Sequence, residues 1–256
     1  MKVQLVGAGP GAADLMTLRA AKALSEAEAV LYDALVCDEA LALAPDRCLR
    51  ICTGKRAGKT SMKQQTINRL MLRLALRGLR VVRLKGGDPS VFGRCGEERD
   101  FLEAHGVDVE VVPGITAASA AAAQFGFPLT HRGEARRLMI ATARTFDGAL
   151  VDGGWREAAD AETTVALYMA GQVAGEVAAR LIAEGRPPST PALAVENAGR
   201  VDARLVTSTL AQLPKAVADA AFEGPVLLLV GAIAARARKT GAEPVAATAL
   251  LARACP

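Results

Sequence analysis

The segment VVRLKGGDPSVFGRCGEE, residues 81–98, carries a short apolar strand pattern into two glycines, an aspartate and a proline. Gly86 and Gly87 can adopt backbone angles that are closed to residues with a Cβ, so a ligand can approach the main chain closely. Asp88 supplies a carboxylate, and Pro89 stiffens the exit of the loop. Carbonyl oxygens and a carboxylate suit a cationic ligand, whereas a phosphate would favour N–H donors. We therefore predict a ligand-binding loop at the end of this strand.

A second glycine-rich turn, VGAGPG at residues 6–11, lies between a strand pattern and a helical pattern. Its main-chain N–H groups could hold an anion or a ribose. The turn nearly matches the dinucleotide fingerprint, with Ala12 at the last position and Asp33 at about the expected 20 residues further on. Pro10 removes one N–H from the turn. A nicotinamide- or flavin-dependent enzyme therefore stays an open alternative.

Asp33 ends the strand pattern AVLYD, and Lys55 lies in the segment TGKR. Taken alone, Asp33 reads as a helix N-cap or turn residue and Lys55 as a solvated surface charge. Both residues, however, follow predicted strands, and ligands of α/β sheets bind at the carboxyl ends of the strands. This location makes Asp33 and Lys55 candidates for a proton-handling pair at this edge, with the structural readings still open.

Arg94, Glu97 and Arg132 are candidates for holding an acidic ligand. The planar fork of arginine binds a carboxylate through two parallel hydrogen bonds, which lysine cannot reproduce. Arg94 could instead pair with Glu97 or Glu98 within a helix, at a gain of about 0.3 to 0.5 kcal/mol. Two groups of basic residues would either bind one polyanionic small molecule or form solvated faces. The first group is Lys55, Arg56, Lys59 and Lys63, and the second is His131, Arg132, Arg136 and Arg137.

Short β-branched runs alternate with longer helical patterns, which is typical of β-α-β units around a largely parallel sheet. We expect strands near Val3–Val6, Ala29–Tyr32, Leu49–Cys52, Val81–Leu84, Val107–Val112, Leu138–Thr142, Thr164–Tyr168, Ala192–Glu196, Arg204–Ser208 and Val226–Val230. We expect helices near Leu15–Ala27, Gln65–Arg77, Glu97–His105, Val173–Glu184 and Leu210–Ala220. Arg204–Ser208 follows the previous strand without a helix, so it should pair antiparallel to that strand.

Ten strands fit two consecutive α/β domains with mostly parallel sheets better than one sheet. We expect an N-terminal domain over residues 1–113, a connecting segment over 114–133, a C-terminal domain over 134–239 and a tail over 240–256.

The composition, 51% hydrophobic and 23% charged residues, is that of a soluble globular protein. No apolar run approaches the roughly 20 residues that cross a bilayer, so we expect a cytoplasmic protein without a membrane partner. A net charge of +4 and 4% aromatic residues argue against nucleic acid as a partner. Five cysteines without paired Cys-x-x-Cys spacing and two histidines predict reduced thiols and no metal site.

The motifs together are more specific than any one of them. VGAGPG, GKR at residues 54–56, GGDP at 86–89, PGIT at 113–116 and PLTHR at 128–132 occur in order. With them the chain resembles the uroporphyrinogen-III C-methyltransferases of tetrapyrrole biosynthesis from Val3 to about Arg238. The resemblance implies the tetrapyrrole methylase fold, with the active site in the cleft between two α/β domains, and a homodimer.

The resemblance also implies roles for individual residues. S-adenosylmethionine would be the methyl donor and S-adenosylhomocysteine its product, with Asp33 as proton acceptor and Lys55 as proton donor. Arg94, Glu97 and Arg132 would contact the substrate. The cofactor contacts would be Pro10, Gly86, Gly87, Asp88, Val91, Thr116, Ala117, Met169 and Ala198.

The implied reaction is methylation of uroporphyrinogen III at C2 and C7, through precorrin-1 to precorrin-2, for sirohaem and cobalamin biosynthesis. Two segments depart from the family pattern. Ala198 stands in VENAG where VENG or VERG is usual, and ATAR at residues 141–144 replaces VTGH. A paralogous methyltransferase for another corrin precursor therefore remains the alternative within the class. A regulatory paralogue that binds tetrapyrrole without turnover is a further possibility, and retention of Asp33 and Lys55 counts against it.

Overall fold

The computed structural model describes residues 2–54, 62–143, 150–151 and 153–238. Among these residues the chain divides into two compact units, the first over residues 2–116 and the second over residues 117–238. Several predicted features lie outside the described residues: Lys55, Arg56 and Lys59 of the first basic group, Arg144 of the ATAR segment, and the tail over residues 240–256.

The first unit contains a parallel sheet of five strands in the order β3-β2-β4-β1-β5. The strands are β1 (Lys2–Gly7), β2 (Ala29–Tyr32), β3 (Leu49–Cys52), β4 (Val81–Lys85) and β5 (Asp108–Val112). All five were predicted, because a sheet covered on both faces needs short runs of β-branched and aliphatic residues. Their parallel pairing is also as predicted.

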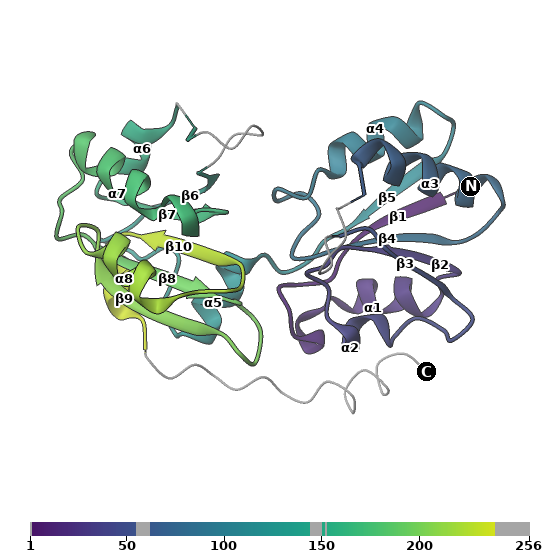
Figure 1. Ribbon diagram of the computed structural model, residues 1–256, viewed down its shortest axis with the longest axis horizontal. Coiled ribbons are helices and arrows are strands. Elements are labelled where there is room, and N and C mark those ends of the chain that lie inside the picture. Colours follow the sequence, from purple (N-terminus) through teal and green to yellow (C-terminus); the bar gives the residue numbers. More distant parts are fainter. Residues whose placement is uncertain (1, 55–61, 144–149, 152, 239–256) are drawn as a thin grey trace. The chain divides into compact units, whose positions relative to one another are not determined.

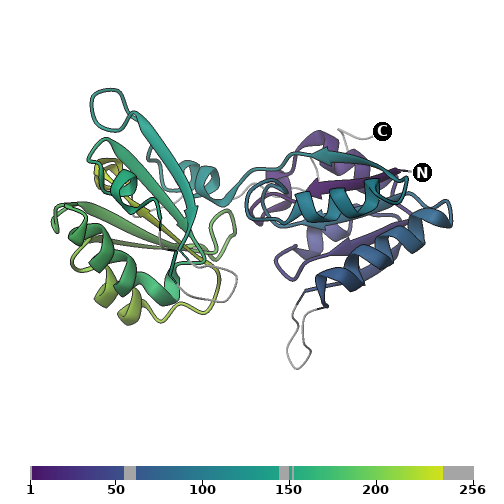
Figure 2. The ribbon, with the colours of Figure 1, turned by 90° about the horizontal axis from the view of Figure 1, so that it is seen from above.

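Helices cover both faces of this sheet (Figures 1 and 2). On one face lie α1 (Leu18–Ser25) and α2 (Asp38–Leu41), and on the other lie α3 (Gln64–Leu76) and α4 (Cys95–Glu103). The first helix begins later than predicted, since the chain first forms a short 3-10 turn, η1 (Ala13–Leu15). Thr17 then caps α1 by accepting a hydrogen bond from the Ala20 amide at 3.1 Å.

The second unit contains a mixed sheet in the order β6-β7-β10-β8-β9. Its strands are β6 (Arg137–Thr142), β7 (Thr163–Tyr168), β8 (Pro191–Glu196), β9 (Arg204–Thr209) and β10 (Val226–Val230). β8 and β9 pair antiparallel, as predicted from the missing helix. β10 is antiparallel to both β7 and β8, and only β6 and β7 are parallel among the described strands.

The expectation of mostly parallel sheets is therefore right for the first unit and wrong for the second. The direct connection from β8 to β9 reverses the chain, and α8 (Leu213–Ala220) then crosses over so that β10 runs in the direction of β9 on the other side of β8. The alternation of strand and helix patterns does not show that the reversal between β8 and β9 also sets the direction in which β10 pairs.

Helices also cover both faces of the second sheet. One face packs against α6 (Trp155–Ala159), α7 (Ala174–Ala183) and α8, with η2 (Gly171–Val173) before α7. The other face packs against α5 (Ala117–Gln124) and η3 (Ala232–Arg236). Since Ala118, Phe125 and Phe127 are buried in this core, part of the segment expected to connect the domains belongs to the second unit.

None of the helices in the described ranges is both long and apolar enough to cross a membrane. Cys37, Cys48, Cys52 and Cys95 are free thiols.

Candidate active site

The carboxyl ends of the five parallel strands lie along one edge of the first sheet. The residues that leave this edge include Ala8 after β1, Asp33 after β2, Thr53 after β3, Gly86 after β4 and Pro113 after β5. Ligands of parallel α/β sheets bind at such an edge. The topology therefore brings most of the first unit's predicted motifs to one place.

The VGAGPG turn is bound to the GGDP loop through the main chain. The Ala8 amide donates to the Lys85 carbonyl at 2.8 Å, and Gly9 and Gly87 exchange two hydrogen bonds at 3.2 and 2.7 Å. These amides are therefore used within the protein, whereas a dinucleotide site offers its turn amides to phosphate.

The strand order also differs from that of dinucleotide-binding folds. There β1 is flanked by β2 and β4 in the order 3-2-1-4-5-6, whereas here β4 lies between β2 and β1. Moreover, η1 separates the turn from α1. Both observations count against the nicotinamide alternative.

Three glycines shape the contact between the VGAGPG turn, the GGDP loop and the segment after β5. A Cβ on Gly114 would lie 2.2 Å from the Gly87 carbonyl oxygen, and one on Gly7 would lie 2.7 Å from the same atom. Gly87 has a φ of +70°, and a Cβ there would meet no described atom within 4 Å. Gly7 and Gly114 are thus required for packing, while Gly87 forms the turn and leaves open space beside the backbone.

Asp88 fixes the GGDP loop from within. One carboxylate oxygen accepts the Gly114 amide at 2.9 Å, and the other accepts the Ser90 amide at 2.8 Å and the Ser90 hydroxyl. Partial burial by itself raises the pKa of Asp88, but the hydrogen bonds from Ser90 and Gly114 outweigh it and hold the pKa below its usual value. The structure therefore gives Asp88 a role in joining two loops, which the sequence did not indicate.

The loop after Asp88 contains two residues in the left-handed conformation, Phe92 (φ 54°) and Arg94 (φ 56°). Such angles are costly for residues with a side chain and concentrate at functional sites. Arg94 donates two hydrogen bonds to the Glu97 carboxylate, at 2.8 and 2.7 Å, and both side chains are about half exposed. The helical pair that the sequence left open as an alternative is therefore present in this structure.

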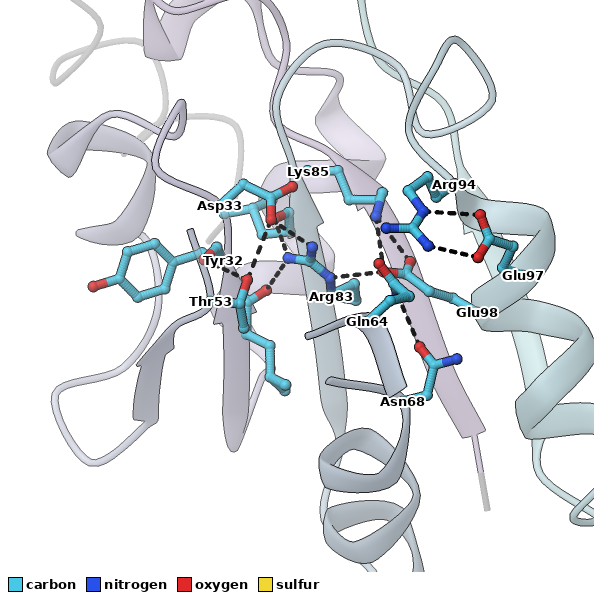
Figure 3. A network of polar contacts seen from close by, with 12 residues as sticks. Tyr32, Asp33, Thr53, Gln64, Asn68, Arg83, Lys85, Arg94, Glu97 and Glu98 are labelled. Atoms are coloured by element: carbon cyan, nitrogen blue, oxygen red, sulfur yellow. Dashed lines mark hydrogen bonds and ion pairs between the residues drawn. The ribbon is translucent and has the colours of Figure 1, made fainter. Parts of the chain in front are cut away.

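Asp33 lies at the exposed end of a buried chain of ion pairs (Figure 3). Its Oδ1 accepts a hydrogen bond from Arg83 Nη2 and one from Thr53 Oγ1 at 3.2 Å. Arg83 Nε donates to Glu98 Oε1 at 3.1 Å. The side chain of Asp33 is 31% exposed, whereas Arg83 is 3% and Glu98 is 0% exposed.

Lys85 and Gln64 complete this network on the face of the sheet covered by α3 and α4. Lys85 Nζ donates to both Glu98 oxygens at 2.9 Å, and Gln64 Nε2 donates to Glu98 Oε1 at 3.0 Å. Burial, followed by the nearby charge of Arg83, lowers the pKa of Lys85, and Glu98 opposes this shift.

Sequence reasoning missed Arg83 and Lys85 as members of the site. The sequence contains a signal for both residues, because Arg83 and Lys85 are two positions apart and therefore point to the same face of a strand that is otherwise apolar. A buried charge needs a partner, and that requirement would have directed the search to Glu98.

In the second unit, Met169 follows β7 and has a φ of 56°, with 58% of its surface exposed. It borders a cavity of about 570 Å³ whose lining includes Gln172, Phe222 and Glu223. A large apolar side chain that is mostly exposed and lies on a left-handed backbone is not typical of a core residue. Met169 is therefore a better candidate for ligand contact than its strand-like sequence context suggested.

Two departures from the family pattern have a structural explanation. Ala198 is 7% exposed, and its methyl group packs in the core beneath the second sheet. Ala143, within ATAR, is fully buried in the core on the other face. Both methyl groups are accommodated by packing among apolar neighbours.

The predicted basic surface of the second unit is largely paired. Arg136 contacts Glu162 at 2.6 Å, and Arg137 forms an ion pair with Asp160. Arg132 is exposed, and none of the described residues pairs with it. Of this group, Arg132 therefore fits an acidic ligand better than its neighbours.

The other predicted cofactor contacts are partly accessible. Pro10 and Val91 are half-buried in the first unit. Thr116, the last residue of that unit, and Ala117, the first of the second unit and of α5, are also half-buried.

The chain matches the family model "Tetrapyrrole (Corrin/Porphyrin) Methylases" over residues 2–214. It is 44% identical over 236 residues to the uroporphyrinogen-III C-methyltransferase of Paracoccus denitrificans, a match that covers 92% of this chain and 82% of that protein. It is 45% identical over 237 residues to the siroheme synthase of Methylococcus capsulatus, covering 93% of this chain and 50% of the synthase. The chain thus spans about half the length of the siroheme synthases that it matches.

Its fold is similar to the crystal structure of the uroporphyrin-III C-methyl transferase from Thermus thermophilus complexed with S-adenyl homocysteine. The TM-score is 0.78 at 39% identity, and the match covers 91% of this chain and 93% of that structure. These matches confirm the resemblance drawn from the ordered motifs. The chain belongs to the tetrapyrrole (corrin/porphyrin) methylase family.

Proposed function

We propose that this chain transfers methyl groups from S-adenosylmethionine to C2 and C7 of uroporphyrinogen III, giving precorrin-1 and then precorrin-2 for sirohaem and cobalamin biosynthesis. The observation that carries the proposal is the 44% identity to the Paracoccus denitrificans uroporphyrinogen-III C-methyltransferase over 92% of this chain. The open, glycine-lined loop at the carboxyl edge of the first sheet supports it.

S-adenosylmethionine supplies a methyl group on a positively charged sulfur. Two features of this chain fit that group: the open space beside Gly87, and the exposed side chain of Met169 on a left-handed backbone. We assign its binding to Pro10, Gly86, Gly87, Val91, Thr116, Ala117, Met169 and Ala198, with Asp88 acting chiefly by holding the loop.

In the reaction, a pyrrole carbon forms a bond to the methyl carbon as the carbon–sulfur bond breaks, and the electron pair of that bond stays on sulfur. Such a displacement depends on alignment, which can supply roughly 7 to 11 kcal/mol. The methylated ring then loses a proton. We assign its acceptance to Asp33, and we assign a proton-donor role to Lys55, which lies outside the described residues. General acid–base help of this kind contributes about 10²- to 10⁴-fold in rate.

Uroporphyrinogen carries eight carboxylates, so the site must present cations. We assign substrate contact to Arg94 and Arg132, with Glu97 orienting the Arg94 guanidinium until the substrate binds. Arginine suits this task because it stays charged and binds carboxylates through two hydrogen bonds.

The test is anaerobic incubation of the purified chain with uroporphyrinogen III and methyl-labelled S-adenosylmethionine, followed by mass analysis of the tetrapyrrole. A gain of two labelled methyl groups is expected. Binding of S-adenosylhomocysteine without any label transfer would refute the substrate assignment and leave the cofactor assignment standing.

A second candidate is methylation of another corrin precursor. The ATAR segment favours it, because an arginine stands where the family usually has histidine. The same assay with precorrin-2 as acceptor separates the two candidates, since only the paralogue would label it.

We also propose that the chain acts as a cytoplasmic homodimer. Light scattering during size-exclusion chromatography measures the mass directly, and a mass of about 26.5 kDa, that of one chain, would contradict the dimer.

A further inference from the structure

We propose that Arg83 is a positioning residue for the methyl-transfer reaction: it fixes Oδ1 of Asp33 so that Oδ2 is the oxygen that accepts the proton. Glu98 in turn fixes Arg83. The proposal rests on the assignment of Asp33 as proton acceptor, and the experiment below separates the two.

The hydrogen bonds of Asp33 are divided unevenly between its two oxygens. Arg83 Nη2 donates to Oδ1, and Thr53 Oγ1 lies 3.2 Å from the same oxygen, with its single proton shared between Oδ1 and the Tyr32 carbonyl at 3.0 Å. No side chain in the described ranges donates to Oδ2. Because a carboxylate oxygen that is already paired with a cation is a poorer acceptor for another proton, this arrangement directs proton transfer to Oδ2.

The Arg83 guanidinium makes several hydrogen bonds besides its ion pair with Asp33. Its Nη1 donates to the carbonyls of Leu31 at 3.3 Å and Leu84 at 3.2 Å, and its Nε donates to Glu98. The guanidinium is planar, so these contacts fix the direction of Nη2 toward Asp33. Figure 3 shows this group between the two carboxylates.

The remaining members balance the charge of the network. Two cations, Arg83 and Lys85, alternate with two carboxylates, Asp33 and Glu98. Glu98 is 0% exposed, and its oxygens accept from Arg83, Lys85 and Gln64. A buried charge with full pairing resists displacement, because breaking one pair leaves another charge without a partner. The network therefore anchors an exposed carboxylate to the interior.

The experiment measures kcat, both KM values and the S-adenosylhomocysteine dissociation constant for the full chain. For Arg83→Met we expect kcat to fall about 10-fold or more, part of the general-base contribution, with KM and the dissociation constant changed less than about 2-fold. Arg99→Met, on the exposed side of α4, is the matched control. Arg83→Lys should recover part of kcat, because it restores the charge without the fork.

Thr53→Val removes the hydroxyl that contacts both Oδ1 and the Tyr32 carbonyl and leaves the buried ion pairs in place, so it keeps the test valid if Arg83→Met fails to fold. We expect it to lower kcat, whereas Thr53→Ser, which keeps the hydroxyl, should not. Unchanged kcat in both Arg83→Lys and Thr53→Val would overturn the proposal.

A double-mutant cycle shows whether Arg83 acts through Asp33. In single-turnover label transfer, Arg83→Met should add little to the loss caused by Asp33→Asn. Equal losses in both backgrounds would overturn the positioning role. Wild-type turnover by Asp33→Asn would instead refute Asp33 as the proton acceptor, whatever the Arg83 variants do.

Discussion

The carboxylate of Asp88 accepts a hydrogen bond from the backbone amide of Gly114 at 2.9 Å, across 26 residues of chain. This contact joins the loop after β4 to the segment after β5 at the edge where the site lies. The two loops are therefore held together as one structural unit.

Asp88→Ala should weaken S-adenosylhomocysteine binding about 10-fold, the consequence of losing roughly 1.4 kcal/mol of loop order. Isothermal titration calorimetry measures the affinity. Ser90→Ala is the matched control, because it keeps the Gly114 contact and the Ser90 amide. Equal losses in both variants would show that the Gly114 contact is unimportant.

The hydrogen bond between Asp88 and Gly114 should weaken in acid, once the Asp88 carboxylate becomes protonated. The pKa of Asp88 is lowered from 3.8 in the folded protein, so its stabilising effect is complete above that value and is lost as pH falls through the lower, folded-state pKa. Loop order should therefore be constant from pH 8 to about 5, and loosen only below about pH 4. Hydrogen exchange of the Gly114 amide, corrected for intrinsic rates, measures this. Loosening already near pH 6 would contradict the assignment.

Gly114→Ala should destabilise the first unit by about 2 kcal/mol, because its Cβ would overlap the Gly87 carbonyl oxygen. Gly96→Ala is the matched control. It lies in α4 with no described atom within 4 Å of the added Cβ, and should stabilise by up to about 1 kcal/mol. Urea unfolding compares the two, and a neutral Gly114→Ala would show that the loops can separate freely.

Arg94→Lys should raise the KM for the tetrapyrrole about 10-fold and leave S-adenosylhomocysteine affinity unchanged, since lysine keeps the charge but loses the second hydrogen bond. Steady-state kinetics give the KM. Arg99→Lys, at an exposed arginine of α4, the helix that follows Arg94, should change neither value. A loss of cofactor affinity in Arg94→Lys would place this residue at the cofactor instead.

Arg186→Met should destabilise the second unit by about 3 kcal/mol. Arg186 is 1% exposed, and its Nη1 donates to the carbonyls of Ala158, Asp160 and Thr163. Removing the guanidinium leaves these acceptors without that donor. Arg180→Met, an exposed arginine of α7, should cost less than about 1 kcal/mol. Thermal unfolding distinguishes the two variants.

Local patterns in the sequence are enough to identify the strands and their order along the chain. The bounds of β2, β3 and β10 agree with the predicted ranges, because a run of aliphatic residues between turn residues is a local signal. The ordered motifs likewise determined the family, since five short segments in sequence are far more specific than one. Placement of Asp33 and GGDP at strand ends followed from the same local pattern.

The charges that meet, and the direction in which the later strands run, follow from the tertiary fold. Arg83 contacts Asp33 across 50 residues and Glu98 across 15, and β10 reverses because of an earlier turn in the chain. Such pairings depend on how strands are ordered in the sheet, and no local periodicity encodes that order. Burial then makes those pairings obligatory, because a charge inside the protein without its partner would cost more than the fold can supply.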